Sequence, residues 1–117
     1  MQKHQRIYKI CKRDAWDDAR RTGELARSEA DLRDGYVHLS SGAQVHGTAL
    51  KHFRGERELV LLEVPVERLP ASALKWEVSR NGEPFPHLYG PLRSEYVERT
   101  YELSTGEDGL VALPDLP

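Results

Sequence analysis

The chain has 117 residues, of which 38% are hydrophobic and 31% are charged, and its formal net charge is −2. This length suits one domain with its own core, so we expect a single domain over residues 1–117 with a core at about residues 7–114. The basic residues are interleaved with acids instead of forming a stripe, which argues against a nucleic-acid-binding protein.

One cysteine, Cys11, excludes an internal disulfide framework. The N-terminal stretch has no long apolar run, which predicts that no signal peptide is present. No segment approaches the 18 or so apolar residues of a membrane span. We therefore expect a cytoplasmic protein with no membrane and no nucleic-acid partner, and the oligomeric state stays open.

The first third of the chain predicts a strand, a helix and a second strand. The first strand covers residues 7–10, and a helix follows that begins near Asp14 and ends at Gly23. Residues 24–33 are polar and predict a loop or partial turn. An Asp-Gly turn then leads into a strand over residues 36–40.

A second helix is predicted directly after this strand. Ser41 and Gln44 have the S-x-x-Q spacing of a capping box, and Val45, Ala49 and Phe53 form one apolar stripe. The strand that follows, residues 58–64, is apolar at both alternations, which indicates burial on both faces.

The second half of the chain predicts short strands only. They cover residues 74–78, the segment around His87, residues 95–103 and residues 110–113, and an Asn-Gly turn precedes the second of them. Two early helices with six or seven short strands predict an α+β fold in a single domain.

Two of these strand segments share one design, in which an imidazole has aromatic or hydroxyl side chains two places away on the same face. These residues are Tyr36, His38 and Ser40 in the first segment, and Phe85, His87 and Tyr89 in the second. If the two strands are neighbours, the imidazoles line one cleft, where they can transfer protons near neutral pH. The structural alternative is that each histidine only satisfies a backbone group or lies at a sheet edge.

Other site types are weakly supported. Glu77 is the strand carboxylate that stands out, because Trp76 on the opposite face would anchor its strand. His46 and His52 are six residues apart and lie on different helix faces, and paired cysteines are absent, so no metal site is predicted. Hydrolase elbows and phosphate-binding glycine loops are also missing.

A series of short motifs resembles domain-of-unknown-function family 952, small bacterial proteins with no established activity. In chain order these motifs are IYKI, DGYVHLS, FRG, LVLLEV, LKWE, FPHLYGPL and DGLVALP. The resemblance covers nearly the whole chain, and DGYVHLS together with FPHLYGPL is its most specific part.

The resemblance implies an ADP-ribosyltransferase-like split β-sheet with two N-terminal helices around a cleft that holds NAD in active relatives. In such enzymes a strand histidine holds the nicotinamide ribose, an aromatic side chain stacks on the nicotinamide, and a glutamate steadies a cationic transition state. His38 matches the first role, and Glu77 or Glu98 would have to supply the carboxylate.

The remaining roles follow from the same resemblance. The stacking surface is expected from Tyr8, Phe85 or Tyr89, and His87 is the second candidate catalytic imidazole. Ser40 lies beside a predicted helix N-terminus and is a candidate ligand contact.

Two functions remain open at the level of sequence. The first is an enzyme that takes NAD, or another nucleotide-like ligand, and transfers or cleaves a glycosyl or ADP-ribosyl group. The second is an inactive ligand-binding or protein-interaction module, because no E-x-E or Q-x-E triplet closes this chain.

Overall fold

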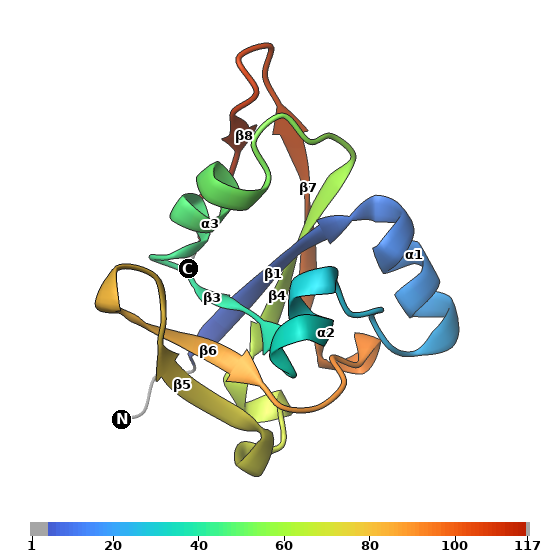
Figure 1. Cartoon of the computed structure of the whole chain (residues 1–117). Coiled ribbons are helices and arrows are strands. Elements are labelled where there is room, and N and C mark those ends of the chain that lie inside the picture. The colour runs from blue at the N-terminus through green and yellow to red at the C-terminus, as the bar shows by residue number, and fades with distance from the viewer. Residues whose placement is uncertain (1–4, 117) are drawn as a thin grey trace.

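The structure is a computed structural model that describes residues 5–116. Within this range the chain forms two antiparallel sheets and three α-helices (Figure 1). The five-stranded sheet has the order β3 (Ser40–Ser41), β1 (Arg6–Lys12), β4 (Leu59–Pro65), β7 (Arg99–Thr105) and β8 (Val111–Ala112). The three-stranded sheet has the order β2 (Val37–His38), β6 (Pro84–Leu88) and β5 (Leu74–Val78).

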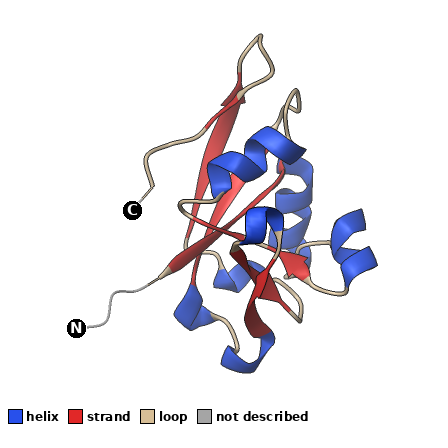
Figure 2. Ribbon diagram, turned by 60° about the vertical axis from the view of Figure 1, so that its left-hand side comes forward, coloured by secondary structure: helices blue, strands red, loops and turns tan. Residues whose placement is uncertain are grey.

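Strand β4 is the centre of the fold. All seven of its residues are buried, as the doubly apolar sequence predicts. One face of the large sheet packs against α1 (Arg13–Thr22) and against the small sheet. The other face packs against α3 (Val45–His52) and the segment that follows β8. Figure 2 shows the long strands running diagonally through the molecule with the short helices around them.

The α+β class is confirmed, but the predicted number of early helices is wrong. Residues 24–33 were expected to be a loop, whereas α2 (Glu29–Asp34) begins inside this segment. The Ser28 hydroxyl accepts the Asp31 N–H, and the Asp31 carboxylate accepts the Ser28 N–H, which completes a capping box. The helix carries no apolar stripe, so hydrophobic periodicity could not reveal it.

The predicted strand over residues 36–40 is divided between the two sheets. Its first part, β2, pairs with β6, and its second part, β3, pairs with β1. Leu39 lies at the junction, where it is buried and its N–H donates to the Pro86 carbonyl. This division holds His38 in one sheet and Ser40 in the other.

Strands β5 and β6 form a hairpin, in which β6 is the central strand and β5 an edge strand of the small sheet. Asn81 and Gly82 both have left-handed backbone angles, as the Asn-Gly turn signal predicts. Trp76 is 38% exposed and Val78 is 73% exposed, so Trp76 is covered only in part. Over the same part of the chain, no helix is both long and apolar enough to span a membrane.

Candidate functional site

The two predicted imidazoles lie side by side on the small sheet. His38 on β2 and His87 on β6 are cross-strand partners, and their ring centroids are 5.7 Å apart. Directly opposed residues of an antiparallel pair project from the same face. The strand alternation of the sequence therefore brings the rings together, as the sequence argument anticipated for neighbouring strands.

His38 is held between two carboxylates of α2. Its Nδ1 lies 2.7 Å from Asp31 Oδ1 and its Nε2 lies 2.9 Å from Asp34 Oδ2. A neutral imidazole carries one N–H, whereas the protonated ring donates from both nitrogens. Both hydrogen bonds are satisfied together only when His38 is an imidazolium ion.

Asp31 links this site to the fold. Its side chain is buried, and besides the His38 ring it accepts the His38 backbone N–H and lies 3.4 Å from Lys9 Nζ. Burial by itself would raise the pKa of Asp31, but the hydrogen bonds from His38 and the charge of Lys9 outweigh it. The net effect lowers the pKa of Asp31, so the carboxylate is ionised at neutral pH.

His87 has a different environment. Its Nδ1 lies 2.7 Å from Glu77 Oε1, and the same oxygen accepts the Tyr89 hydroxyl at 2.7 Å. The hydrogen bond from Tyr89, followed by that from His87, lowers the pKa of Glu77. The bond to Glu77 raises the pKa of Tyr89 to about 12. The Nε2 of His87 has no hydrogen-bond partner within the described chain.

Tyr36 packs against this arrangement. Its ring stacks on His87 at 4.0 Å between centroids and also contacts the rings of His38, at 4.6 Å, and Tyr89, at 5.2 Å. An aromatic ring against an imidazole fixes the imidazole plane and restricts water around it. Tyr36 therefore packs on a face of the His87 ring, whereas Glu77 holds the ring at Nδ1.

A cleft of about 870 Å³ opens beside the two imidazoles. Residues of β1, α2, α3 and the β5–β6 hairpin line it. Of the residues predicted for the site, those that line the cleft are His38, His87, Tyr8, Ser40 and Phe85. Glu77 and Tyr89 are not part of the lining, and they lie next to His87 through their hydrogen bonds.

Four of the predicted residues that line the cleft are buried, and one of them is His87, which is 3% exposed. Tyr8 is 1% exposed in the core under α3, and its hydroxyl has no hydrogen-bond partner among the described residues. Burial, with the nearby Glu63 carboxylate, raises the pKa of Tyr8 to about 12. The Ser40 hydroxyl lies 2.7 Å from Thr48 Oγ1, and Phe85 is also buried.

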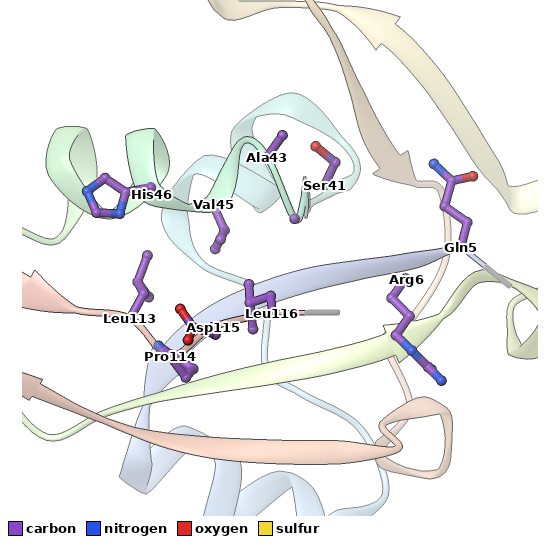
Figure 3. A pocket seen from close by; sticks show the side chains of 11 residues that line it. Gln5, Arg6, Ser41, Ala43, Val45, His46, Leu113, Pro114, Asp115 and Leu116 are labelled. Atoms are coloured by element: carbon purple, nitrogen blue, oxygen red, sulfur yellow. The ribbon is translucent and has the colours of Figure 1, made fainter. Parts of the chain in front are cut away.

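A second hollow of about 1000 Å³ lies elsewhere on the molecule. Figure 3 shows that its walls come from the start of β1, the beginning of α3 and the C-terminal segment, with His46 on the helix side. None of the residues predicted for the site lines this hollow. In the described part of the chain, no three or more His, Cys, Asp or Glu side chains are arranged to hold a metal ion.

Residues 10–100 match the model of a family described as a protein of unknown function, DUF952. The chain belongs to DUF952. The seven side chains of the imidazole network all fall inside the matched segment: Asp31, Asp34, Tyr36, His38, Glu77, His87 and Tyr89.

Solved structures of one DUF952-like relative match the protein closely. The crystal structure of CC0527 from Caulobacter crescentus is 48% identical, covers 92% of this chain and 93% of its own, and has a TM-score of 0.86. The solution NMR structure of CC0527 is 49% identical over 89% of both chains, with a TM-score of 0.78. No curated protein matches the chain.

The sequence argument missed part of this DUF952 site. Asp31 and Asp34 were placed in a loop or a turn, although Ser28 and Asp31 have the S-x-x-D spacing that would have revealed the cap of α2. Lys9 was read only as part of the first strand, whereas its amino group donates to the His38 carbonyl at 3.0 Å.

Proposed function

We propose that this DUF952 protein binds a small polar ligand of nucleotide type, with NAD as the first candidate, and cleaves or transfers its glycosyl group. The observation that supports the proposal is the contrast between the two imidazoles. His87 has one nitrogen fixed by Glu77 and the other without a partner in the described chain, whereas both nitrogens of His38 face carboxylates.

This contrast suits acid–base chemistry. When Nδ1 of His87 donates to Glu77, Nε2 carries a lone pair and can accept a proton from water or a ligand hydroxyl. Glu77 thus acts as a positioning residue that fixes the ring and its tautomer, in the manner of the carboxylate in a catalytic triad. In the same cleft, His38 and its carboxylate partners Asp31 and Asp34 would hold a ribose hydroxyl.

The proposed reaction with NAD is a hydrolysis. The bond between the ribose carbon and the nicotinamide nitrogen breaks, and its electron pair leaves with nicotinamide. A water oxygen forms the new bond to the ribose carbon, and the water proton passes to Nε2 of His87. In the transfer reaction an acceptor hydroxyl takes the place of water.

One observation favours the alternative, a binding or interaction module without catalysis. His38 already has a carboxylate on each nitrogen, and Glu77 Oε1 accepts two hydrogen bonds. A polar network that satisfies itself can also serve only to fix the structure. The two functions differ in turnover and not in the position of the site.

Calorimetric titration with NAD and ADP-ribose, followed by measurement of nicotinamide release over hours, tests the proposal. We expect His87→Ala to abolish release and His38→Ala to weaken binding, while His46→Ala, which changes a histidine of the other hollow, alters neither. Binding without release would establish the module. The absence of both binding and release would refute a nucleotide ligand.

A further inference from the structure

Arg80 reaches across the cleft from the β5–β6 hairpin to α3. Its guanidinium lies over the Phe85 ring, with 4.9 Å between Cζ and the ring centroid. Its Nη2 lies 3.3 Å from Thr48 Oγ1 on α3. A Cβ at Gly47 would be 3.2 Å from Nη2, so the missing side chain lets the guanidinium lie against the helix.

The guanidinium of Arg80 has no carboxylate partner among the residues that the structure describes. Its one hydrogen bond goes to a neutral hydroxyl, and the Phe85 ring covers only one of its faces. Arginine presents a planar set of donors that matches phosphate oxygens in a bidentate contact. Most of this donor capacity is unused within the described chain, and Arg80 lines the cleft.

The surroundings of Arg80 are positively charged. The basic side chains that line the cleft are Lys9, Lys12, Arg27, Arg33, Lys51 and Arg80. Three of the four lining carboxylates are already engaged, Asp31 and Asp34 with His38 and Glu56 with Lys12. The fourth, Glu29, lies at the start of α2. Lys9, Lys12 and Arg33 are paired with Asp31, Glu56 and Asp34. Lys51 on α3 and Arg80 have no carboxylate partner among the described residues, so the α3 side of the cleft keeps their positive charge.

His52 lies in the same positively charged environment. It lies one position after Lys51 on α3 and also lines the cleft. Burial lowers the pKa of His52, and the charged neighbours that lower it further are Lys51, Arg80, His38 and Lys9. Thr48, Lys51 and His52 are spaced i, i+3 and i+4, so they project from one face of the helix.

We propose that Arg80, positioned by Thr48, forms together with Lys51 the subsite for a phosphate group of the ligand. The substrate class is therefore a phosphorylated sugar or nucleotide, and an unphosphorylated nucleoside is a poor ligand. The inference rests on the proposed function for the location of the ligand, since the same cleft holds His38 and His87. The inference places the phosphate group on the α3 side of the cleft and the bond that reacts on the side of His38 and His87.

Titration of the protein with inorganic pyrophosphate tests the subsite, with ribose as the uncharged probe. We expect pyrophosphate to shift the backbone amide resonances of Thr48 and Lys51, and ribose to leave them unchanged. Arg80→Gln should weaken pyrophosphate binding at least tenfold, because a charge-assisted bidentate contact is lost. Arg80→Lys keeps the positive charge but cannot form the bidentate contact, so it should give an intermediate affinity.

Two further variants keep the result interpretable. Gly47→Ala should keep the fold, because alanine favours a helix. It should reduce pyrophosphate affinity less than Arg80→Gln does, because the guanidinium has to move by only a few tenths of an ångström away from the new methyl group. Arg93→Gln, which changes an arginine paired with Glu95 away from the cleft lining, should bind like the wild type. Thermal unfolding of each variant checks that the fold is retained.

Two results would overturn the inference: no pyrophosphate binding to the wild type, or equal affinity in a folded Arg80→Gln variant. Failure of the proposed function is recognised separately, because it appears as absence of nicotinamide release while pyrophosphate still binds at Arg80. Release of nicotinamide that does not depend on Arg80 would retain the function and reject the subsite.

Discussion

Asp31 is the residue on which the site and the fold depend together. Its carboxylate caps α2 through Ser28, lies near Lys9 and accepts both the ring and the backbone N–H of His38. A buried carboxylate with this many partners is costly to neutralise, because each partner then loses the negative charge of Asp31 that it faces.

Replacement of Asp31 by asparagine should therefore destabilise the protein. We expect the free energy of unfolding at neutral pH to fall by about 2–3 kcal/mol, the range for buried hydrogen bonds to charged groups. Asp18→Asn is the matched control, because Asp18 makes only an exposed ion pair with Arg21. Chemical denaturation measures both, and an Asp31→Asn variant as stable as Asp18→Asn would contradict this role.

The pH dependence of this difference has a definite sign. The pKa of Asp31 in the folded protein lies below the ordinary value of 3.8, so the folded state favours the ionised form. The stabilisation is complete above pH 3.8 and is lost as the pH falls from there through the folded-state pKa. The wild type and Asp31→Asn should become more alike in acid, and a difference that grows in acid would be inconsistent with an ionised Asp31.

The sequence identified both imidazoles and Glu77, but not Asp31 and Asp34, the two carboxylates beside His38. His38 and His87 could be predicted because strand alternation decides which side chains share a face. Asp31 could not be found in the same way, because its segment has no apolar periodicity and was interpreted as a loop. Glu77 was singled out because Trp76 was expected to anchor its strand, and Trp76 is 38% exposed.

At the scale of elements, the short helix α2 positions the acidic half of the site. It has six residues, is closed by the capping box of Ser28 at its start and ends at Gly35 in the left-handed conformation. A helix this short is not stable by itself and depends on its caps and tertiary contacts. The cap therefore affects the orientation of His38 as well as the helix.

Ser28→Ala should lower the free energy of unfolding by about 1 kcal/mol, the usual cost of a lost N-cap. It should also increase amide hydrogen exchange over α2 and shift the ring resonances of His38, because Asp31 loses one of its constraints. Ser72→Ala changes a serine on the surface outside this helix and serves as the control. Unchanged exchange over α2 in Ser28→Ala would show that the cap does not hold the helix.

The division of residues 36–40 between two sheets shows what strand patterns leave out. A period of two indicates which side chains share a face, but not which strand is the neighbour. The sequence pattern does not show where the chain passes from one sheet to the other. In the structure the chain changes sheets at Leu39, because β2 pairs with β6 and β3 pairs with β1. The strand was predicted, and its partners were not.

At the scale of the whole molecule, the site lies where the two sheets meet. Lys9 comes from the five-stranded sheet and donates to the His38 carbonyl of the three-stranded sheet, while α2 supplies the carboxylates. The α+β class follows from composition and element pattern, whereas the order of the strands arises from contacts far apart in sequence. A cleft beside the imidazoles could be anticipated from the two strand segments only on the condition that they are neighbours, which the sequence does not decide.

The protonation states of the two imidazoles provide the most direct test of the proposed site. NMR spectra of the histidine ring nitrogens at neutral pH, assigned through His38→Ala and His87→Ala, distinguish the protonated ring from each neutral tautomer. We predict that His38 carries protons on both nitrogens and that His87 is neutral with its proton on Nδ1. A neutral His38, or a His87 protonated on both nitrogens, would contradict the proposed division of roles.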